Sequence, residues 1–415
     1  MNILYACAVD LSQQFAGTTH VLETVNGLRR RGHRVLLVST KHGRSETTAP
    51  GHRDSFRLPV PQVPVLRPLV FHVLLFVYIV CVTLRHRIHV IYEREIPFGF
   101  GLRIAALLMQ IPRVVEVNGL PGDEENAPVQ RKLRDKLRAI FQRIDLRAAS
   151  AVVTVTARMK RVLIECYSLR PERVAVVQNG ANDTLFRPLD KFRCRSETGL
   201  SHARKYICYV GSFFRYHAIE NIVKAAPAVI AGRPEVVFLL VGDGQERRRC
   251  EEMVKVAKLG EHFLFTGARP YETIPKYICA SDLCLFMYRP GSPRQSVSPL
   301  KVFEYLACER PVLVLANDCD MLGTAAEAAG SPPFLHHDDV GPPLVARGIL
   351  AALSDPEILE ETARRGREFV LQHHTWARVA QDIEFVLLGT RAGRKARHSV
   401  HVGPRPKAEA AAVLR

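Results

Sequence analysis

Short apolar runs alternate with amphipathic segments along most of the chain. Continuous runs rich in β-branched residues are typical of strands buried in parallel sheets, and the segments between them repeat apolar residues at helical spacing. The strands predicted in this way are residues 3–9, 33–39, 89–92, 112–118, 151–156, 174–178, 206–210, 236–241, 263–266, 283–287 and 312–316. Strands that alternate with helices predict doubly wound parallel sheets. The fold class is therefore expected to be α/β, with Rossmann-like sheets.

A polar and charged segment at residues 188–205 interrupts this alternation. A chain of 415 residues is long enough for two domains of ordinary size. We therefore expect a first domain at residues 1–189 and a second domain at residues 190–374. A final helix is predicted at residues 375–389, and the basic, non-periodic residues 390–415 are predicted to be a disordered tail.

Two segments of the first domain carry the composition of membrane-contacting helices. Leu69–Leu84 is the most hydrophobic stretch, and it follows residues 40–68, which are predicted to be a loop. It is shorter than the about 20 apolar residues of a spanning helix, so a core helix and a helix inserted into one leaflet both remain open. Arg131–Arg147 is a basic amphipathic helix, which suits an anionic membrane surface or, alternatively, a core face. Its predicted apolar stripe consists of Leu133, Leu137, Ile140, Phe141 and Ile144.

The composition is that of a globular, basic protein, with 47% hydrophobic residues, 24% charged residues and a net charge of +17. Such a balance indicates an anionic partner, but no nucleic-acid-binding motif is present, so nucleic acid is not expected. Ten cysteines without CxxC pairs predict reduced core thiols rather than a zinc site or a disulfide framework. The first residues read as a strand rather than a signal peptide, so a cytoplasmic location is expected.

The segment Tyr288–Asn317 carries the clearest chemistry, as a loop, a short helix and a buried strand. Ser298 is predicted to be the N-cap, and Pro299 suits the first helical position. Lys301 then falls in the first turn, where the helix macrodipole favours anions rather than cations. Unpaired N–H groups beside a cation at a helix start are suited to a phosphate.

The charges around this helix favour the same interpretation. Arg289 and Arg294 precede the helix, and no carboxylate occurs between Asp282 and Glu304. Glu304 lies one turn after Lys301 and could accept hydrogen bonds from sugar hydroxyls. The alternative is an ordinary solvated loop before a structural helix.

Three loops have a composition that lets a ligand approach the backbone. Small residues at Phe15–Thr19 precede a predicted helix at His20–Arg31. Gly211 follows a predicted strand and can bring backbone amides against a diphosphate. Residues Gly119–Glu125 follow the carboxyl end of another strand, where open α/β sheets bind ligands.

The run SPLKVFEYLACERPVL at residues 298–313 resembles the donor-binding segment of glycosyltransferase family 4, the retaining enzymes with the GT-B fold. The runs GHRVLLVS, VVQNGANDTLFRP and HTWARVAQDIEFVL are similar to other segments of that family. The resemblance covers roughly residues 1–388 and is most specific in the second half. It implies two Rossmann-like domains that face each other across a cleft, with the helix at residues 375–389 returning to the first domain.

The resemblance also implies a donor site. The helix start, with Ser298, Leu300 and Lys301, would hold the donor diphosphate, and Glu304 would bind the ribose hydroxyls. The remaining donor-side residues expected from the resemblance are Gly17, Gly211, Ser212, Arg215, His217, Gly242, Arg269 and Arg289.

Three positions depart from the family pattern. Ser296 stands where the family has a glutamate near the transferred sugar. Ser212 and His217 stand where it commonly has an arginine and a lysine on the phosphates. We expect Arg215 and Lys301 to replace these cations, and His217 to donate to a phosphate when it is protonated or in the right tautomer. A histidine without a role in the site is the alternative for His217.

The acceptor side is expected at the end of the strand at residues 112–118. Asn118 stands where many family members have a histidine, and Glu124 and Glu125 follow it; ordinary surface polar residues are the alternative. Asn118, Glu124, Lys301 and Glu304 are thus the candidate catalytic residues.

The expected function is retaining transfer of a hexosyl unit from a nucleotide-diphosphate sugar, without a metal ion or cofactor. The expected acceptor is a glycan or a lipid-linked acceptor at the cytoplasmic membrane face, with the protein bound peripherally. A non-catalytic GT-B scaffold, or another nucleotide-sugar enzyme such as an epimerase, is the alternative.

Overall fold

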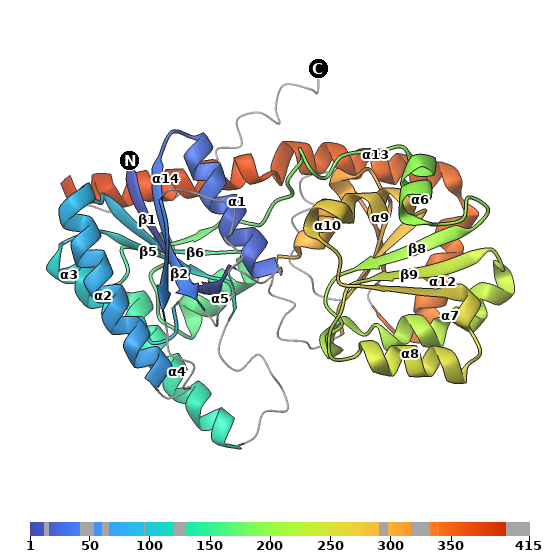
Figure 1. The fold of residues 1–415 in the computed structure, drawn as a ribbon, viewed down its shortest axis with the longest axis horizontal. Helices are drawn as coiled ribbons and strands as arrows, with labels where there is room; N and C mark the ends of the chain where they lie inside the picture. The colour runs from blue at the N-terminus through green and yellow to red at the C-terminus, as the bar shows by residue number, and fades with distance from the viewer. Residues whose placement is uncertain are drawn as a thin grey trace. The chain divides into compact units, whose positions relative to one another are not determined.

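The computed structural model describes residues 1–11, 16–41, 54–59, 66–94, 96–119, 129–289, 298–316, 333–337 and 339–395. The chain divides into two compact units, the first comprising Met1–Val177 with Ala380–Arg415 and the second comprising Gln178–Val379. Each unit contains one parallel sheet with helices packed on it (Figure 1). The predicted α/β class with two Rossmann-like domains is confirmed.

The division between the units lies earlier than the boundary that we placed after residue 189. The residues that follow Val177 belong to the second unit. Ala181 forms a β-bridge with Thr375, and Phe186 is fully buried in a core cluster of the second unit. The polar composition of residues 188–205 therefore marks not a linker but a surface helix, α6 (Lys191–Thr198).

The first unit contains a seven-stranded parallel sheet in the order β3-β2-β1-β4-β5-β6-β7. Its strands are β1 (Asn2–Asp10), β2 (Arg34–Lys41), β3 (Ser55–Pro59), β4 (Val90–Arg94), β5 (Arg113–Val117), β6 (Ala151–Thr154) and β7 (Val174–Val176). All but β3 were predicted. In the part of the chain that the structure describes, this strand pairs only with β2 at the sheet edge, where a short strand ending in proline is tolerated, so the predicted loop at residues 40–68 is wrong there.

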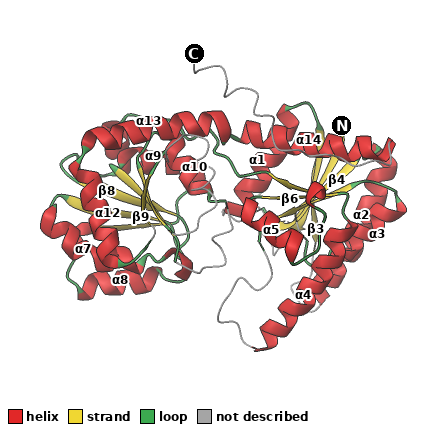
Figure 2. Ribbon diagram, turned by 180° about the vertical axis from the view of Figure 1, so that it is seen from behind, coloured by secondary structure: helices red, strands yellow, loops and turns green. Residues whose placement is uncertain are grey.

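The helices of the first unit are α1 (Ala16–Arg30), α2 (Leu66–His86), α3 (Phe100–Leu108), α4 (Val129–Ala148), α5 (Ala157–Glu165) and most of α14 (Trp376–Lys395). Figure 2 shows them from the other side. Helix α5 was not predicted. Helix α1 begins at Ala16 rather than at His20, so Gly17 lies in its first turn instead of in a loop.

Helix α2 has one buried side and one exposed side, and both are apolar. Phe71, Leu75 and Ile79 are buried in the core of the first unit. By length and composition alone, the segment Pro68–His86 is long enough and apolar enough to cross a membrane. Its mean hydropathy is 2.1, and 22% of its most apolar stretch is buried inside the protein. The contacts of its buried side identify it as a packed helix of the sheet domain.

Helix α4 is turned so that polar residues face inward. Asp145 is buried and accepts a hydrogen bond of 2.9 Å from Arg113, which also binds the buried Glu93 at 2.6 Å. Gln142 is buried and accepts from Tyr167 at 2.7 Å. The apolar residues Ile140, Phe141 and Ile144, which the alternative interpretation placed in a core, are exposed.

The second unit contains a six-stranded parallel sheet in the order β10-β9-β8-β11-β12-β13. Its strands are β8 (Lys205–Val210), β9 (Val236–Val241), β10 (Phe263–Gly267), β11 (Leu283–Met287), β12 (Val312–Leu315) and β13 (Leu335–His337). Its helices besides α6 are α7 (Glu220–Gly232), α8 (Arg247–Val256), α9 (Ile274–Ala280), α10 (Leu300–Ala307), α12 (Pro342–Ser354) and α13 (Pro356–His373).

Alternate residues of β8 show that this sheet is buried on both faces. Cys208 packs in one core cluster with side chains of α9, α10 and α13. Its neighbours Ile207 and Tyr209 pack in a second cluster with side chains of α7, α8 and α12. Burial on both faces explains why these strands are continuous apolar runs.

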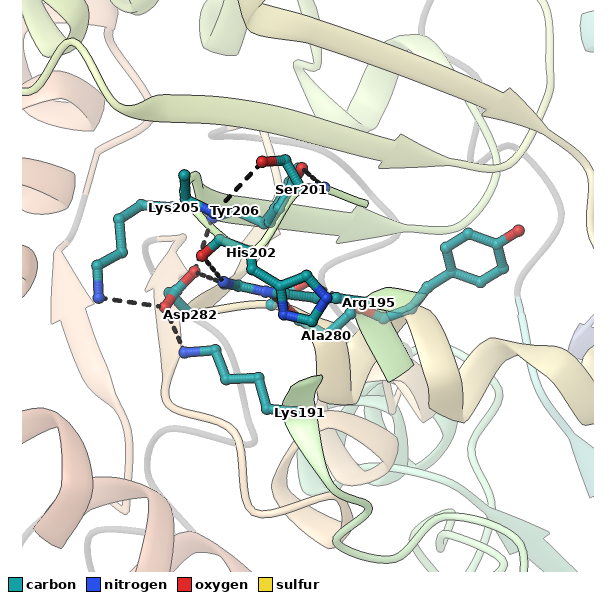
Figure 3. Close-up of polar contacts among 11 residues, drawn as sticks. Lys191, Arg195, Ser201, His202, Lys205, Tyr206, Ala280 and Asp282 are labelled. Atoms are coloured by element: carbon teal, nitrogen blue, oxygen red, sulfur yellow. Dashed lines mark hydrogen bonds and ion pairs between the residues drawn. The ribbon is translucent and has the colours of Figure 1, made fainter. Parts of the chain in front are cut away.

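An ion-pair network fastens α6 to the sheet of the second unit (Figure 3). Asp282, at the start of β11, accepts from Arg195 at 2.7 Å and from the backbone N–H of Tyr206 at 2.7 Å. It also binds Lys191, and Lys205 at 3.5 Å. Because the side chains of Arg195 and Asp282 are only 4% and 6% exposed, the network ties α6 to β8 and β11.

The final helix belongs mostly to the first unit and is longer than predicted. Within it, Glu384 accepts from Arg31 at 2.6 Å and pairs with His33 at 2.6 Å. These contacts hold it against the end of α1. The helix continues to Lys395, so the tail predicted from residue 390 is wrong for residues 390–395, and residues 396–415 lie outside the described residues.

Candidate functional site

Helix α10 begins in the second unit without a side-chain cap. Pro299 is the N-cap and Leu300 the first helical residue, so the predicted N-cap Ser298 lies one position too early. Ser298 instead binds Asn179: its Oγ accepts from the backbone N–H at 3.2 Å and its carbonyl accepts from the side-chain amide at 2.8 Å. Among the residues that the structure describes, no side chain therefore accepts from the first backbone N–H groups of α10.

The side chain of Lys301 extends from this first turn to the end of β8. Its Nζ donates to Tyr209 Oη at 3.1 Å and lies 4.5 Å from the centre of the tyrosine ring. Burial lowers the pKa of Lys301 to about 7, although Glu304, one turn later, acts in the opposite direction. An ammonium group with so little solvation gains unusually much from an anionic ligand.

Gly211 makes room for this ammonium group. It has a φ of +142°, and a Cβ atom there would lie 2.5 Å from Lys301 Nζ. Gly242, with a φ of +137°, has no room for a Cβ because it would overlap the carbonyl oxygen of Gly211. The loops after β8 and β9 therefore touch backbone to backbone, as hydrogen bonds from Gly211 N to Val241 O (2.9 Å) and Phe213 N to Asp243 O (2.9 Å) also show.

His217 lies beside Lys301 and not at an exposed position. Its Nδ1 is 3.2 Å from the carbonyl oxygen of Met287, which can only accept, so Nδ1 carries the proton. Its Nε2 then presents a lone pair to Lys301 Nζ at 3.5 Å. The ring is buried and stacks on Tyr288 at 5.1 Å. In this tautomer His217 supports the ammonium group of Lys301, and its donation to a phosphate stays a prediction.

Glu304 is buried on the next turn of α10. Its Oε1 accepts from Tyr271 Oη at 2.8 Å, and Tyr271 belongs to a short 3-10 turn, η4 (Tyr271–Thr273). The ring of Tyr271 packs against Phe186 at 5.2 Å. Glu304 is therefore held in one orientation, one helical turn beyond Lys301.

The predicted arginines that the structure describes lie in separate surroundings. Arg289 pairs with Glu220 of α7, so the absence of carboxylates along the sequence does not leave its charge unbalanced. Arg215 and Ser212 have exposed side chains; their carbonyl oxygens accept from Arg289 (3.3 Å) and Tyr209 (2.9 Å), respectively. Arg269 is exposed and lies 5.8 Å from the ring of Tyr277.

In the first unit, Asn118 follows β5 and is half-buried. Its amide group donates to Glu116 at 2.7 Å, and Glu116 also pairs with His20 of α1. Neither partner was predicted as a site residue, because His20 and Glu116 are far apart in sequence. The predicted residues Glu124 and Glu125, together with Arg294 and Ser296, lie outside the described residues.

Taken together, one group of predicted residues is brought into contact: Gly211, His217 and Lys301, with the unpredicted Tyr209. They lie at the carboxyl end of β8 in an open parallel sheet, next to an uncapped helix N-terminus. This end of such a sheet is where α/β domains of this kind bind nucleotides and other phosphate-bearing ligands. The fold and this site define a two-domain, Rossmann-like protein with a candidate anion-binding site in its second unit.

Comparison with known proteins gives the family. Residues 17–185 match the model described as Glycosyltransferase Family 4, and residues 204–355 match the model described as Glycosyl transferases group 1. The chain therefore belongs to the group 1 glycosyltransferases of the GT-B fold.

Individual relatives are distant. The chain is 29% identical to 2-deoxystreptamine N-acetyl-D-glucosaminyltransferase of Streptomyces fradiae over 54% of its length, and the match spans 50% of that enzyme. It is 23% identical to alpha-maltose-1-phosphate synthase of Mycolicibacterium smegmatis, over 68% of this chain and 74% of the relative.

Solved structures share the fold along the whole chain. Sucrose-phosphate synthase from Thermosynechococcus elongatus superimposes with a TM-score of 0.76 and 19% identity, covering 95% of this chain and 100% of that one. HepE of Anabaena in complex with UDP-glucose gives a TM-score of 0.72 and 18% identity, with 94% and 99% coverage.

Proposed function

We propose that this protein transfers a hexosyl unit from a nucleoside-diphosphate sugar to a glycan or lipid-linked acceptor, with retention of anomeric configuration and without a metal ion. The observation that carries the proposal is the position of Lys301. Its ammonium group lies against Gly211, next to the uncapped N-terminus of α10. A diphosphate at this place would receive backbone N–H groups, a cation and the positive end of the helix dipole.

The chemistry requires stabilisation of the leaving group. The bond between the sugar C1 and the diphosphate oxygen breaks, and a bond between C1 and an acceptor oxygen forms; the acceptor proton passes to the departing diphosphate. Negative charge accumulates on the diphosphate in the transition state, where preoriented donors act most strongly. Lys301 and the amides of α10 would supply this stabilisation, and Glu304 would hold the ribose.

A calorimetric screen of nucleoside diphosphates tests the binding part of the proposal. UDP is the first to measure, because the solved HepE structures contain UDP and UDP-glucose. Binding of one nucleoside diphosphate in the presence of EDTA is the expected result. If none of UDP, GDP and ADP binds, the donor site is refuted; if binding requires added Mg²⁺, metal independence is refuted.

Incubation with the matching nucleotide sugar tests the reaction. We expect slow donor hydrolysis alone and faster turnover with an acceptor, with the product keeping the anomeric configuration of the donor in proton NMR. An inverted product contradicts retention. An epimerised nucleotide sugar identifies an epimerase instead, and tight donor binding without any turnover identifies a scaffold.

Replacing Glu304 by glutamine is expected to weaken nucleoside-diphosphate binding about threefold to tenfold, because a neutral amide accepts hydroxyl hydrogen bonds less strongly than a carboxylate. Calorimetry on the folded variant measures the change. The matched control is Glu309→Gln, which alters a partly exposed glutamate just after the same helix. Unchanged affinity with reduced turnover would assign Glu304 a role away from the ribose.

We further propose that the acceptor is reached at the cytoplasmic face of the cell membrane, to which the protein binds peripherally. The support is an apolar surface on α2, α3 and α4, which lie side by side in the first unit (Figure 1, Figure 2). On α2 the exposed residues repeat every fourth position, as Leu69, Val73 and Val77. Leu107 and Leu108 on α3 are 66% and 67% exposed.

The orientation of α4 extends this surface. Ile140, Phe141 and Ile144 are 56%, 45% and 49% exposed, while the polar Gln142 and Asp145 are buried. A large exposed apolar area of this kind marks a contact surface. Helices α2 and α3 contain no acidic residue, and α4 carries many basic ones, so the charge suits an anionic leaflet.

The protein is expected to sediment with phosphatidylglycerol vesicles at low salt and to be released as salt increases, because screening weakens its attraction to the leaflet. The double change Leu107→Ser and Leu108→Ser should lower vesicle affinity about tenfold or more through lost apolar burial. Reversing charge on α4, with Lys132→Glu, Arg134→Glu and Arg138→Glu, should abolish the binding.

The control is Phe385→Ser, which removes an exposed phenylalanine on α14, outside this surface. It should bind vesicles like the unchanged protein. Failure of the unchanged protein to bind phosphatidylglycerol vesicles at low salt would refute the membrane proposal and leave the donor-site proposal intact.

A further inference from the structure

At the end of β5, the buried carboxylate of Glu116 lies next to the half-buried amide of Asn118. Glu116 and Asn118 are two positions apart, so their side chains leave the chain on the same side of the strand. β5 pairs with β4, and β4 pairs with β1, after which the order of strands reverses. The two residues therefore lie one strand away from the point at which open α/β sheets bind their ligands.

The Glu116 side chain is held by three groups from three elements. It pairs with His20 from α1, accepts from the Asn118 amide at 2.7 Å, and lies 3.9 Å from a guanidinium nitrogen of Arg94 on β4. Burial by itself raises the pKa of Glu116, but His20, Arg94 and Asn118 outweigh burial and lower that pKa to about 2. Glu116 is thus a carboxylate at any physiological pH, although it is only 1% exposed.

An ionised carboxylate can only accept hydrogen bonds, which determines the orientation of Asn118. The amide must turn its NH2 group toward Glu116, because the opposite orientation would set the amide oxygen against the carboxylate. The Asn118 oxygen then points away from Glu116. Within the parts of the chain that the structure describes, no hydrogen bond from a donor group to this oxygen is found.

Two buried tyrosines lie near the charge of Glu116. The rings of Tyr5 and Tyr92 lie on β1 and β4, 5.3 Å apart, and both are fully buried. The pKa of each of these tyrosines is raised well above its ordinary value by burial and by the nearby Glu116 charge. The phenols therefore stay neutral, and the negative charge remains on Glu116.

We infer that Glu116 is a positioning residue that turns the Asn118 oxygen outward to accept a hydrogen bond from the acceptor hydroxyl, with His20 holding Glu116 in place. This inference rests on the proposed function, since it takes the end of β5 as the acceptor side. The carboxylate does not touch the acceptor itself. The competing role is purely structural, with the pair of His20 and Glu116 fastening α1 to the sheet.

Exchanging the two functional groups separates these roles. In Glu116→Gln, two amides face each other. Asn118 can then turn either its oxygen or its NH2 group outward, so its orientation is no longer determined. In the double variant Glu116→Gln with Asn118→Asp, the new glutamine donates to the new carboxylate, whose second oxygen again faces outward as an acceptor. The pair keeps its hydrogen bond and its total charge, while the negatively charged partner of His20 is lost in both variants.

The first readout needs no acceptor. In protein labelled with [15N]asparagine, the Asn118 side-chain amide signal is assigned by its loss in Asn118→Ala. We expect one of its protons to be shifted downfield and slow to exchange, and both properties to vanish in Glu116→Gln. The matched control is Glu93→Gln, a buried carboxylate on β4 bonded to Arg113, which should leave the signal unchanged.

The second readout is transfer of radiolabelled glucose from UDP-glucose to octyl β-D-glucoside. Glu116→Gln should lower kcat/KM for this acceptor about tenfold, the effect of one lost hydrogen bond, with the KM for the donor unchanged. The double variant should recover to within about threefold of the unchanged protein. A double variant no better than Glu116→Gln would overturn the inference in favour of the structural role.

The two readouts also separate this inference from the function on which it rests. If the unchanged protein transfers no glucose to octyl β-D-glucoside, the proposed acceptor class fails, while the amide signal still decides how Asn118 is oriented. An Asn118 amide signal with the shift and exchange rate of a solvated amide overturns the inference, whatever the activity.

Discussion

Replacing Lys301 by methionine is expected to raise the Kd for the bound nucleoside diphosphate by about one to two orders of magnitude. A hydrogen bond to a charged group is worth about 1.5–3 kcal/mol, and methionine keeps the length of the side chain while removing the charge. The ammonium group lies between Gly211, Tyr209 and His217, and the substitution removes the positive charge from this position. Calorimetry at pH 7 measures the change.

Lys255→Met, on the surface of α8, is the control for loss of one positive charge from the second unit. This variant should bind the nucleoside diphosphate with a Kd within about twofold of that of the unchanged protein, because an exposed charge contributes little to the interaction. A Lys301→Met variant that melts normally and binds the nucleotide as before would refute the phosphate role of Lys301.

The same residue predicts how nucleotide affinity depends on pH. The pKa of Lys301 is about 7 without ligand, and a bound diphosphate raises it, so binding requires a protonated lysine. Below pH 7 the lysine is already protonated and adds no pH dependence. Above pH 7 each binding event must take up a proton, and the Kd should rise by up to about tenfold per pH unit. Calorimetry at pH 8 in two buffers of different ionisation enthalpy should detect this proton, and Lys301→Met should show none.

Replacing Asp282 by alanine is expected to destabilise the second unit by about 3–5 kcal/mol, because it leaves a buried guanidinium without its counter-charge. Arg195 is 3% exposed and donates to Asp282 at 2.7 Å, and the same carboxylate accepts from the backbone of Tyr206 (Figure 3). Loss of this one side chain therefore removes the ion pairs between α6 and the sheet, while Arg195 keeps its hydrogen bond to the carbonyl oxygen of Ala280 at 3.0 Å. Urea unfolding, followed by a probe in the second unit, measures the loss.

Asp243→Ala is the matched control, since Asp243 is 55% exposed and pairs with Arg247 at 3.0 Å. Exposed ion pairs contribute about 0–1 kcal/mol, so this variant should unfold nearly as the unchanged protein does. If Asp282→Ala lowers the free energy of unfolding no more than Asp243→Ala does, the ion-pair network does not stabilise the second unit.

Much of the fold can be predicted from the sequence, because parallel strands that are buried on both faces are all continuous apolar runs. β9 and β11 were predicted at their observed bounds, since each is a continuous apolar run with no competing helical period. The edge strand β3 has no such run and was predicted as loop. Its strand conformation depends on pairing with β2, which local composition does not encode.

For the candidate site, the sequence by itself determined the position of Lys301 on the first turn of α10 and the position of Gly211 directly after β8. The tertiary structure decided which of the predicted cations remain available, because Glu220 comes from α7 to neutralise Arg289. It also decided the tautomer of His217, through the carbonyl of Met287, and the outward orientation of the apolar side of α4, through Arg113 and Asp145. Each of these three features depends on partner residues from other elements. A local pattern of residues does not show which distant groups the fold brings together.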